Sequence, residues 1–177
     1  MFEVLKPDVY VESICNIDSK KLKKIRNIDG IVVDLDNTLI AWGEENINNE
    51  IDEWITDAKN LGLKLCIVSN TRSKRVAKFA EIFQIPYSSN SLKPFNASFN
   101  KALKILNTTH LETIVIGDQI FTDVLGGNLL NLFTILVTPI VKKDSIGTFF
   151  HRNIEKIIIS YWVKRGILKK VVGKWPK

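Results

Sequence analysis

The stretch GIVVDLDNTLIAW, residues 30–42, decides the fold class of this sequence of 177 residues. Its first four residues are a glycine and three β-branched apolar residues, a composition typical of a strand buried inside a sheet. The apolar run stops at Asp34, and a second carboxylate follows at Asp36. We therefore expect a buried strand that ends at a pair of acidic side chains.

Three further segments repeat this pattern of a short apolar run that stops at a polar residue. They are residues 64–68 before Ser69, residues 113–116 before Gly117 and Asp118, and residues 134–137 before Thr138. Between the runs, apolar residues recur at helical spacing, as in Ile51, Trp54, Ile55, Ala58 and Leu61. Strands that alternate with amphipathic helices predict an α/β fold with a central parallel sheet.

Length and composition predict one domain over residues 1–177. The apolar fraction of 45% and the charged fraction of 25% are those of an average globular protein, which disfavours disordered and fibrous classes. Cys15 and Cys66 lack the spacing of a metal cage, so we expect reduced thiols. Neither a signal-peptide pattern nor an apolar run of about 18 residues occurs, which predicts a cytoplasmic protein.

Polar motifs follow three of the predicted strands, at residues 34–38 (DLDNT), 69–71 (SNT) and 117–123 (GDQIFTD). Each motif alone also fits a turn or a helix cap, because Asp, Asn and Ser hydrogen bond to nearby backbone there. In an open parallel sheet, however, ligands bind beyond the carboxyl ends of the strands. The motifs together would gather four acids at one crevice: Asp34, Asp36, Asp118 and Asp123.

Four carboxylates in one crevice repel one another unless a cation neutralises them. A set of ligands made only of oxygen atoms favours Mg²⁺, which keeps several waters and is often completed by a substrate phosphate. The sequence therefore predicts metal-assisted phosphoryl chemistry.

In order and in kind, these motifs resemble the four motifs of the haloacid dehalogenase (HAD) superfamily. The segment DLDNTL from Asp34 resembles the first motif, Ser69 the second, Lys93 in Leu92-Lys93-Pro94 the third, and Gly117-Asp118 through Asp123 the fourth. The segments GIVVDLDNTLIAW, IVSN, KP and VIGDQIFTDVLGGN are similar to the YqeG-type phosphatases of HAD subclass IIIA across nearly the whole chain. The resemblance implies a three-layer, Rossmann-like fold.

The resemblance also implies a role for each residue. Asp34 is expected to attack phosphorus and form an aspartyl phosphate, and Asp36 to protonate the leaving group and then activate water. Mg²⁺ is expected to bind Asp34, Asp118 and the backbone carbonyl of Asp36, while Asp123 orients Lys93 or a metal-bound water. The expected phosphate-binding residues are Ser69, Asn70, Lys93 and Thr38.

Three of these assignments have a structural alternative. Asn70 and Thr38 also fit local backbone capping, and Lys93 beside Pro94 also fits a surface position next to a turn.

The gaps between motifs leave no room for the cap domain that covers small substrates in many HAD enzymes. Only 32 residues separate Asp36 from Ser69, and only 23 separate Ser69 from Lys93. We therefore expect a capless enzyme with an open crevice, suited to a phosphate on a large molecule. Trp42 and Glu44 fall in the segment expected to form a flap.

The C-terminal part of the chain carries most of the positive charge. Residues 142–177 hold ten Lys or Arg and two acids, a balance of +8 within a total of +6. Apolar and aromatic residues alternate with these cations, which predicts a basic amphipathic helix over about residues 149–172. Such a helix can lie on an anionic membrane, and it can equally cover one face of the sheet.

YqeG-type proteins are similar to the phosphatidylglycerophosphate phosphatases of mitochondria and plastids. This resemblance implies a phospholipid substrate, hydrolysed to phosphatidylglycerol at the inner face of the membrane. Two alternatives stay open: a capless phosphatase for nucleotides, sugar phosphates or phosphoproteins, and a non-catalytic nucleic-acid or ribosome-associated protein. Because the residues show no RNA-binding motif, we expect no nucleic-acid partner.

Overall fold

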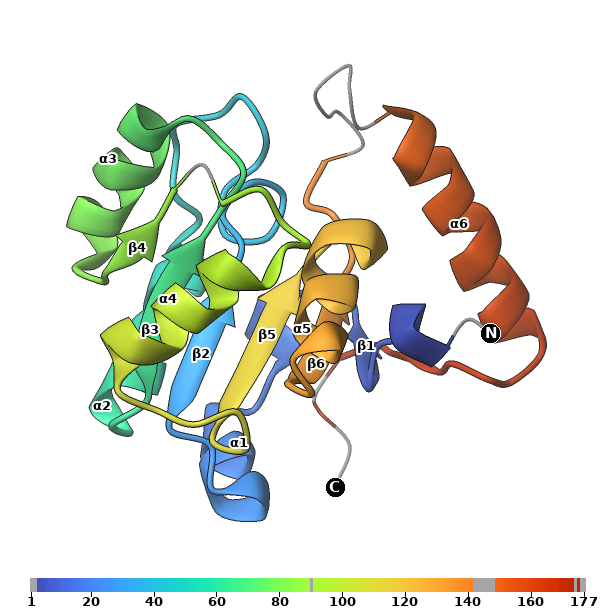
Figure 1. The fold of residues 1–177 in the computed structure, drawn as a ribbon, viewed down its shortest axis with the longest axis horizontal. Coiled ribbons are helices and arrows are strands. Elements are labelled where there is room, and N and C mark those ends of the chain that lie inside the picture. Colours follow the sequence, from blue (N-terminus) through green and yellow to red (C-terminus); the bar gives the residue numbers. More distant parts are fainter. Residues whose placement is uncertain (1–2, 90, 142–148, 174, 176–177) are drawn as a thin grey trace.

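The computed structural model describes residues 3–89, 91–141, 149–173 and 175. Its centre is a seven-stranded sheet in which every neighbouring pair of strands is parallel, in the order β4-β3-β2-β5-β6-β1-β7 (Figure 1). The strands are β1 (Val9–Val11), β2 (Gly30–Val33), β3 (Lys64–Val68), β4 (Tyr87–Ser88), β5 (Thr113–Gly117), β6 (Phe133–Val137) and β7 (Lys170–Val171). The predicted α/β class with a central parallel sheet is confirmed.

Helices connect the strands and cover both faces of the sheet, which gives three layers (Figure 1). The α-helices are α1 (Ser19–Arg26), α2 (Asn49–Asn60), α3 (Ser73–Phe83), α4 (Asn96–Leu106), α5 (Leu125–Leu129) and α6 (Phe149–Lys164). Three short helical turns complete the described elements: η1 (Glu3–Leu5), η2 (Ile14–Asn16) and η3 (Ile120–Val124).

Alternate residues of each strand belong to different apolar cores. Ile31 and Val33 of β2 pack in a core that includes the buried faces of α2 and α3, whereas Val32 packs with α4 on the other face of the sheet. Because side chains of a strand point alternately to its two faces, a strand covered on both sides must be apolar at every position. All four residues of β2 are buried accordingly.

Helix α6 packs over the β6–β1 side of the sheet. Its Trp162 is buried in a third apolar core with Tyr10 of β1, Leu136 of β6 and Ile120 of η3. Figure 1 shows this helix, in orange-red, standing at the edge of the molecule away from α2 and α3. One face of α6 thus contacts the body, and the rest of its surface faces outward.

The C-terminal helix is shorter than predicted. We predicted helix to about residue 172, but α6 ends at Lys164 and the chain then forms β7 beside β1. Gly166 has a φ of 67°, a left-handed backbone conformation that ends helices and that glycine adopts without steric cost. The last segment therefore extends the sheet instead of the helix.

No domain is inserted between the motifs in the part of the chain that the structure describes. Only a loop and α2 join β2 to β3, and α3 and β4 lie between β3 and Lys93. The predicted capless architecture agrees with this arrangement. Among these same residues, no helix is long and apolar enough to span a membrane.

Candidate active site

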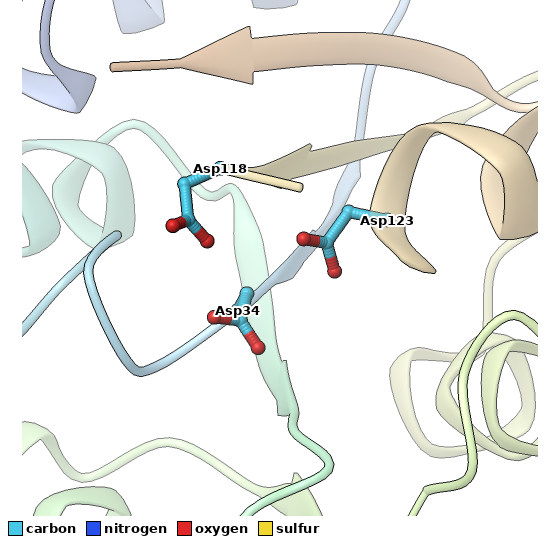
Figure 2. A group of neighbouring side chains, drawn as sticks. All are labelled: Asp34, Asp118 and Asp123. Atoms are coloured by element: carbon cyan, nitrogen blue, oxygen red, sulfur yellow. The ribbon is translucent and has the colours of Figure 1, made fainter. Parts of the chain in front are cut away.

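Three acidic side chains meet at the carboxyl ends of the two central strands. Asp34 follows β2, Asp118 follows β5, and Asp123 lies in η3 just beyond. Oxygen atoms from the three carboxylates all lie within 4.8 Å of one another, and all three residues are buried. Figure 2 shows the carboxylates turned toward one shared space. The backbone places Asp34 there, because its N–H donates to the carbonyl oxygen of Ile116 and continues the sheet ladder.

Lys93 joins two of these acids. Its Nζ donates hydrogen bonds of 2.6 Å to Oδ1 of Asp34 and of 2.6 Å to Oδ1 of Asp123. The lysine is 7% exposed, so the structure does not place it on the surface beside a turn. A buried ammonium between two carboxylates is a fixed positive charge within the acidic cluster.

Asn70 holds Lys93 in place through its backbone. The Asn70 Oδ1 accepts a 2.7 Å hydrogen bond from the Lys93 N–H, and its Nδ2 donates to the Lys93 carbonyl at 3.3 Å. Both ends of the amide are therefore engaged. In this geometry Asn70 positions Lys93, and the direct phosphate contact that we predicted for it stays a prediction.

Ser69 and Thr38 lie at the same edge of the sheet. Ser69 follows β3, is 2% exposed, and its Oγ accepts a hydrogen bond from the Thr71 N–H at 3.2 Å. Thr38 is 1% exposed, and its Oγ1 donates to Oδ1 of Asp118 at 3.4 Å. Thr38 thus contacts an acid of the cluster, while Ser69 takes part in a local turn.

The carboxylate of Asp36 lies outside the cluster of three. It accepts hydrogen bonds from Thr71 Oγ1 and, at 2.9 Å, from Arg75 Nε of α3. The predicted metal contact of Asp36 is made by its backbone carbonyl and not by this carboxylate, so it stays a prediction. Its carboxylate is held by Arg75 of α3 and by Thr71, and the acid and base role that we predicted for it stays a prediction.

The segment after β2, which carries Asp36 and Thr38, forms a tight turn. Asn37 has a φ of 64°, and its side-chain oxygen accepts from the Trp42 N–H at 3.2 Å. Its carbonyl oxygen accepts from the N–H of Ile140, beyond β6, at 3.0 Å. Asparagine tolerates the left-handed conformation better than most residues, so the turn and its anchor to a neighbouring loop depend on this one position.

The sequence analysis missed Arg75 of α3, which contacts Asp36, and two charged residues of α6. Arg152 donates from Nη1 to the Asp118 carbonyl oxygen at 2.6 Å and from Nη2 to the Asp118 carboxylate. Glu155 accepts from Arg152 Nη1 at 3.3 Å and from the Phe121 N–H at 3.0 Å. Through these hydrogen bonds, α6 contacts the segment that carries Asp118 and Asp123.

Burial and neighbouring charges shift the pKa values of the charged groups in the cluster. Burial raises the pKa of Asp34 to about 7, against the opposing effect of Lys93, and the nearby Asp123 charge adds to the rise. Burial likewise holds the pKa of Asp118 well above its usual range, although Arg152 opposes it. For Lys93, burial alone would lower the pKa, but Asp123 and Asp34 together raise it above its ordinary value.

The donor set fits a hard divalent cation. The three buried residues offer carboxylate oxygens only, and their three acids outnumber the two buried cations that contact them, Lys93 and Arg152. An additional positive charge would satisfy this deficit, and oxygen ligands are those that Mg²⁺ and similar ions prefer.

Comparison with known proteins identifies the family of the chain. Residues 40–131 match the family model of the haloacid dehalogenase-like hydrolases, and the chain belongs to this family. It is 41% identical over 160 residues to "Probable phosphatase YqeG" of Bacillus subtilis (strain 168), an alignment that covers 90% of this chain and 92% of that protein. The predicted enzyme class, an HAD-type phosphatase, is confirmed.

Two further proteins are more distantly similar to this chain. The chain is 27% identical over 174 residues to "Phosphatidylglycerophosphate phosphatase 1, chloroplastic/mitochondrial" of Arabidopsis thaliana, which covers 91% of this chain and 49% of that protein. The crystal structure of an uncharacterized protein from Listeria monocytogenes serotype 4b superposes with a TM-score of 0.55 and 17% identity. That match covers 67% of this chain and 85% of the other, and it supports the fold alone.

Proposed function

We propose that this chain is a Mg²⁺-dependent phosphomonoesterase that acts through an aspartyl phosphate on Asp34, with phosphatidylglycerophosphate as its substrate and phosphatidylglycerol as its product. The observation that carries the proposal is the contact of a buried lysine with a buried aspartate at the carboxyl end of the sheet. Lys93 Nζ lies 2.6 Å from Asp34 Oδ1, and the carboxylate of Asp118 lies beside them.

In the first half-reaction, a carboxylate oxygen of Asp34 forms a bond to phosphorus while the bond to the leaving alkoxide breaks. Asp36 supplies a proton to that alkoxide from its position beside Thr71 and Arg75. Lys93 donates hydrogen bonds to non-bridging phosphate oxygens, and Asp123 keeps the ammonium oriented. In the second half-reaction, Asp36 as a carboxylate removes a proton from water, whose oxygen forms a bond to phosphorus. The bond between phosphorus and the Asp34 carboxylate oxygen breaks, which releases inorganic phosphate and restores Asp34.

Asp34, Asp118 and the backbone carbonyl of Asp36 are the proposed ligands of Mg²⁺. The ion supplies positive charge that offsets both the acids and the phosphate oxygens. Thr38, which contacts Asp118, helps to hold that carboxylate.

Two features support a lipid substrate. The described residues include no cap, so a phosphate presented at a membrane could reach the crevice. Helix α6 exposes Ile157 at 69% and Tyr161 at 53% beside the exposed cations Lys156 and Lys164. Apolar and aromatic side chains among cations are typical of helices that bind anionic membrane surfaces. The similarity to the Arabidopsis phosphatidylglycerophosphate phosphatase points to the same substrate.

The experiment is phosphate release by the purified protein with Mg²⁺, with phosphatidylglycerophosphate in mixed micelles compared with nucleotides, sugar phosphates and phosphopeptides. We expect the lipid to give the highest kcat/KM, and EDTA to abolish turnover. Asp34→Asn should lower kcat by about a thousandfold or more while leaving the far-UV circular dichroism spectrum unchanged.

The experiment tests the lipid substrate and the catalytic mechanism independently. A clear preference for a soluble phosphate would exclude the lipid but keep the phosphatase mechanism. Full turnover by Asp34→Asn would exclude the mechanism whatever the substrate.

A further inference from the structure

An apolar groove with a volume of about 550 Å³ lies beside the acidic cluster, lined by α6 and by the segment that follows β6. Asp118 and Arg152 are among its lining residues, and these two also form the ion pair at the cluster. The groove therefore borders the candidate active site on the side of the Asp118–Arg152 ion pair. Its volume is within the range of about 300–1,000 Å³ that is usual for small-molecule sites.

The groove wall is largely apolar, and part of it is accessible. Val163 of α6 is 43% exposed and Ile140, after β6, is 45% exposed, while Ile159 lies half-buried between them and the third apolar core. Exposed apolar surface and concave, mostly apolar pockets often mark ligand-binding sites.

Two cations border this apolar wall. The exposed Lys156 lines the groove, and Lys170 of β7 lines it with its ammonium 5.5 Å from the ring centre of Tyr10. Among the residues that the structure describes, neither lysine forms an ion pair with a carboxylate. The one acid of α6 in the lining, Glu155, is instead bound to Arg152 and to the Phe121 N–H.

The arrangement along α6 thus has three chemically different parts. On the groove-lining side of α6, Arg152 beside Asp118 comes first, Lys156 follows one turn later, and the apolar Ile159 and Val163 follow after it. Phosphatidylglycerophosphate has the same three parts in the same order: a terminal phosphate monoester, a phosphodiester, and acyl chains. Nucleotides and sugar phosphates have no acyl chain that would fill the groove.

We propose that this groove binds one acyl chain of the phospholipid substrate, and that Lys156 and Lys170 bind its phosphodiester. The inference rests on the proposed function and names the residues that would select a lipid. Ile159, Val163 and Ile140 form the chain-binding wall, whereas the outer residue Ile157 does not line the groove.

The test separates the groove from a general attachment to membranes. Monomeric phosphatidylglycerophosphate analogues with two to six carbons per acyl chain are assayed below their micelle concentration, so that no surface is present. For the wild type we expect kcat/KM to rise by about threefold for each methylene that enters the groove. Val163→Trp fills the groove and should abolish this dependence on chain length. Ile157→Trp, on the same helix but outside the groove, is the matched control and should keep it.

Lys156→Gln tests the proposed contact of Lys156 with the phosphodiester. Lys164→Gln is the control, because Lys164 is an exposed lysine of the same helix that does not line the groove. The ratio of kcat/KM for the dihexanoyl lipid to that for p-nitrophenyl phosphate should fall about tenfold in Lys156→Gln. The ratio should stay within twofold in Lys164→Gln.

Three results would overturn the inference. The first is a wild-type kcat/KM that does not depend on chain length while the lipid is still hydrolysed, which leaves the proposed function intact. The second is an equal loss in Val163→Trp and Ile157→Trp, which would indicate membrane contact by the whole helix. The third is unchanged lipid kinetics with altered sedimentation in Val163→Trp, which would assign the groove to a second copy of the chain. If the wild type hydrolyses no lipid at all, the proposed function itself fails.

Discussion

Arg152 donates two hydrogen bonds to Asp118, one to its backbone oxygen and one to its carboxylate, and both side chains are almost fully buried. A residue near the start of the last helix thus neutralises an acid that follows the central strand β5. Because Asp118 is also a proposed metal ligand, the same carboxylate has two possible counter-charges. The stability of the metal-free protein should therefore depend on Arg152.

Arg152→Gln is expected to lower the free energy of unfolding of the metal-free protein by about 3 kcal/mol, because it leaves a buried carboxylate without its ion-pair partner. Mg²⁺ should restore more stability in this variant than in the wild type. Urea denaturation with EDTA and with Mg²⁺ measures both effects. Arg165→Gln, which changes an exposed arginine just after α6, should stay within about 0.5 kcal/mol. Equal effects of the two substitutions would contradict this prediction.

The pKa of Asp34 predicts how the stability of the metal-free protein depends on pH. The folded state raises this pKa from 3.8 to about 7, so between these values the folded protein holds a proton that the unfolded chain has lost. Stability should therefore fall as the pH rises through this window, by about 2 kcal/mol between about pH 5 and about pH 8. Urea denaturation in EDTA at both pH values measures it. In Asp34→Asn the decrease should be smaller by that amount, and an identical decrease in both proteins would refute the assignment.

Asn70→Ala tests whether the position of Lys93 depends on the Asn70 amide. The substitution removes both hydrogen bonds to the Lys93 backbone, so the ammonium should lose its fixed geometry beside Asp34. We expect kcat for p-nitrophenyl phosphate to fall by about tenfold to a hundredfold, the scale of a displacement near 1 Å in a catalytic group. The exposed Asn100 of α4, changed to Ala, serves as the control. A variant with normal kcat would show that Lys93 is held by other contacts.

Much of the fold could be predicted because its central strands carry a strong local signal. The runs at β2, β3, β5 and β6 are apolar at nearly every position, since each is covered on both faces. The strands β1, β4 and β7 have only two or three residues, too few to show a period, and their pairing is set by tertiary contacts. We predicted that α6 ends at about residue 172, but it ends at Lys164, although Gly166 was a stop signal in the sequence.

The motif residues of the site could be predicted because they lie directly after strands of one parallel sheet. The strand ends alone required Asp34, Ser69 and Asp118 to gather at one edge. Arg152 and Glu155 gave no such signal, because charged residues in a basic helix are usually solvated. Only the packing of α6 against η3 reveals that these two charges are buried. The side-chain direction of Asp36 was likewise beyond the sequence, since it depends on Arg75 of another element.

Gly117→Ala should show that the approach of Asp123 to the cluster requires a residue without a side chain. A Cβ at Gly117 would lie 2.3 Å from Cγ of Asp123, so the carboxylate would have to move away from Lys93. We expect a loss of about 1–3 kcal/mol in stability and a large fall in kcat for the protein that remains folded. Gly126→Ala is the matched control, because its Cβ would lie 2.4 Å from the Phe99 ring, which belongs to the α4 core. That variant should lose comparable stability but keep its kcat, measured below its own Tm. A normal kcat in Gly117→Ala would mean that the contact between Asp123 and Lys93 is not needed for turnover.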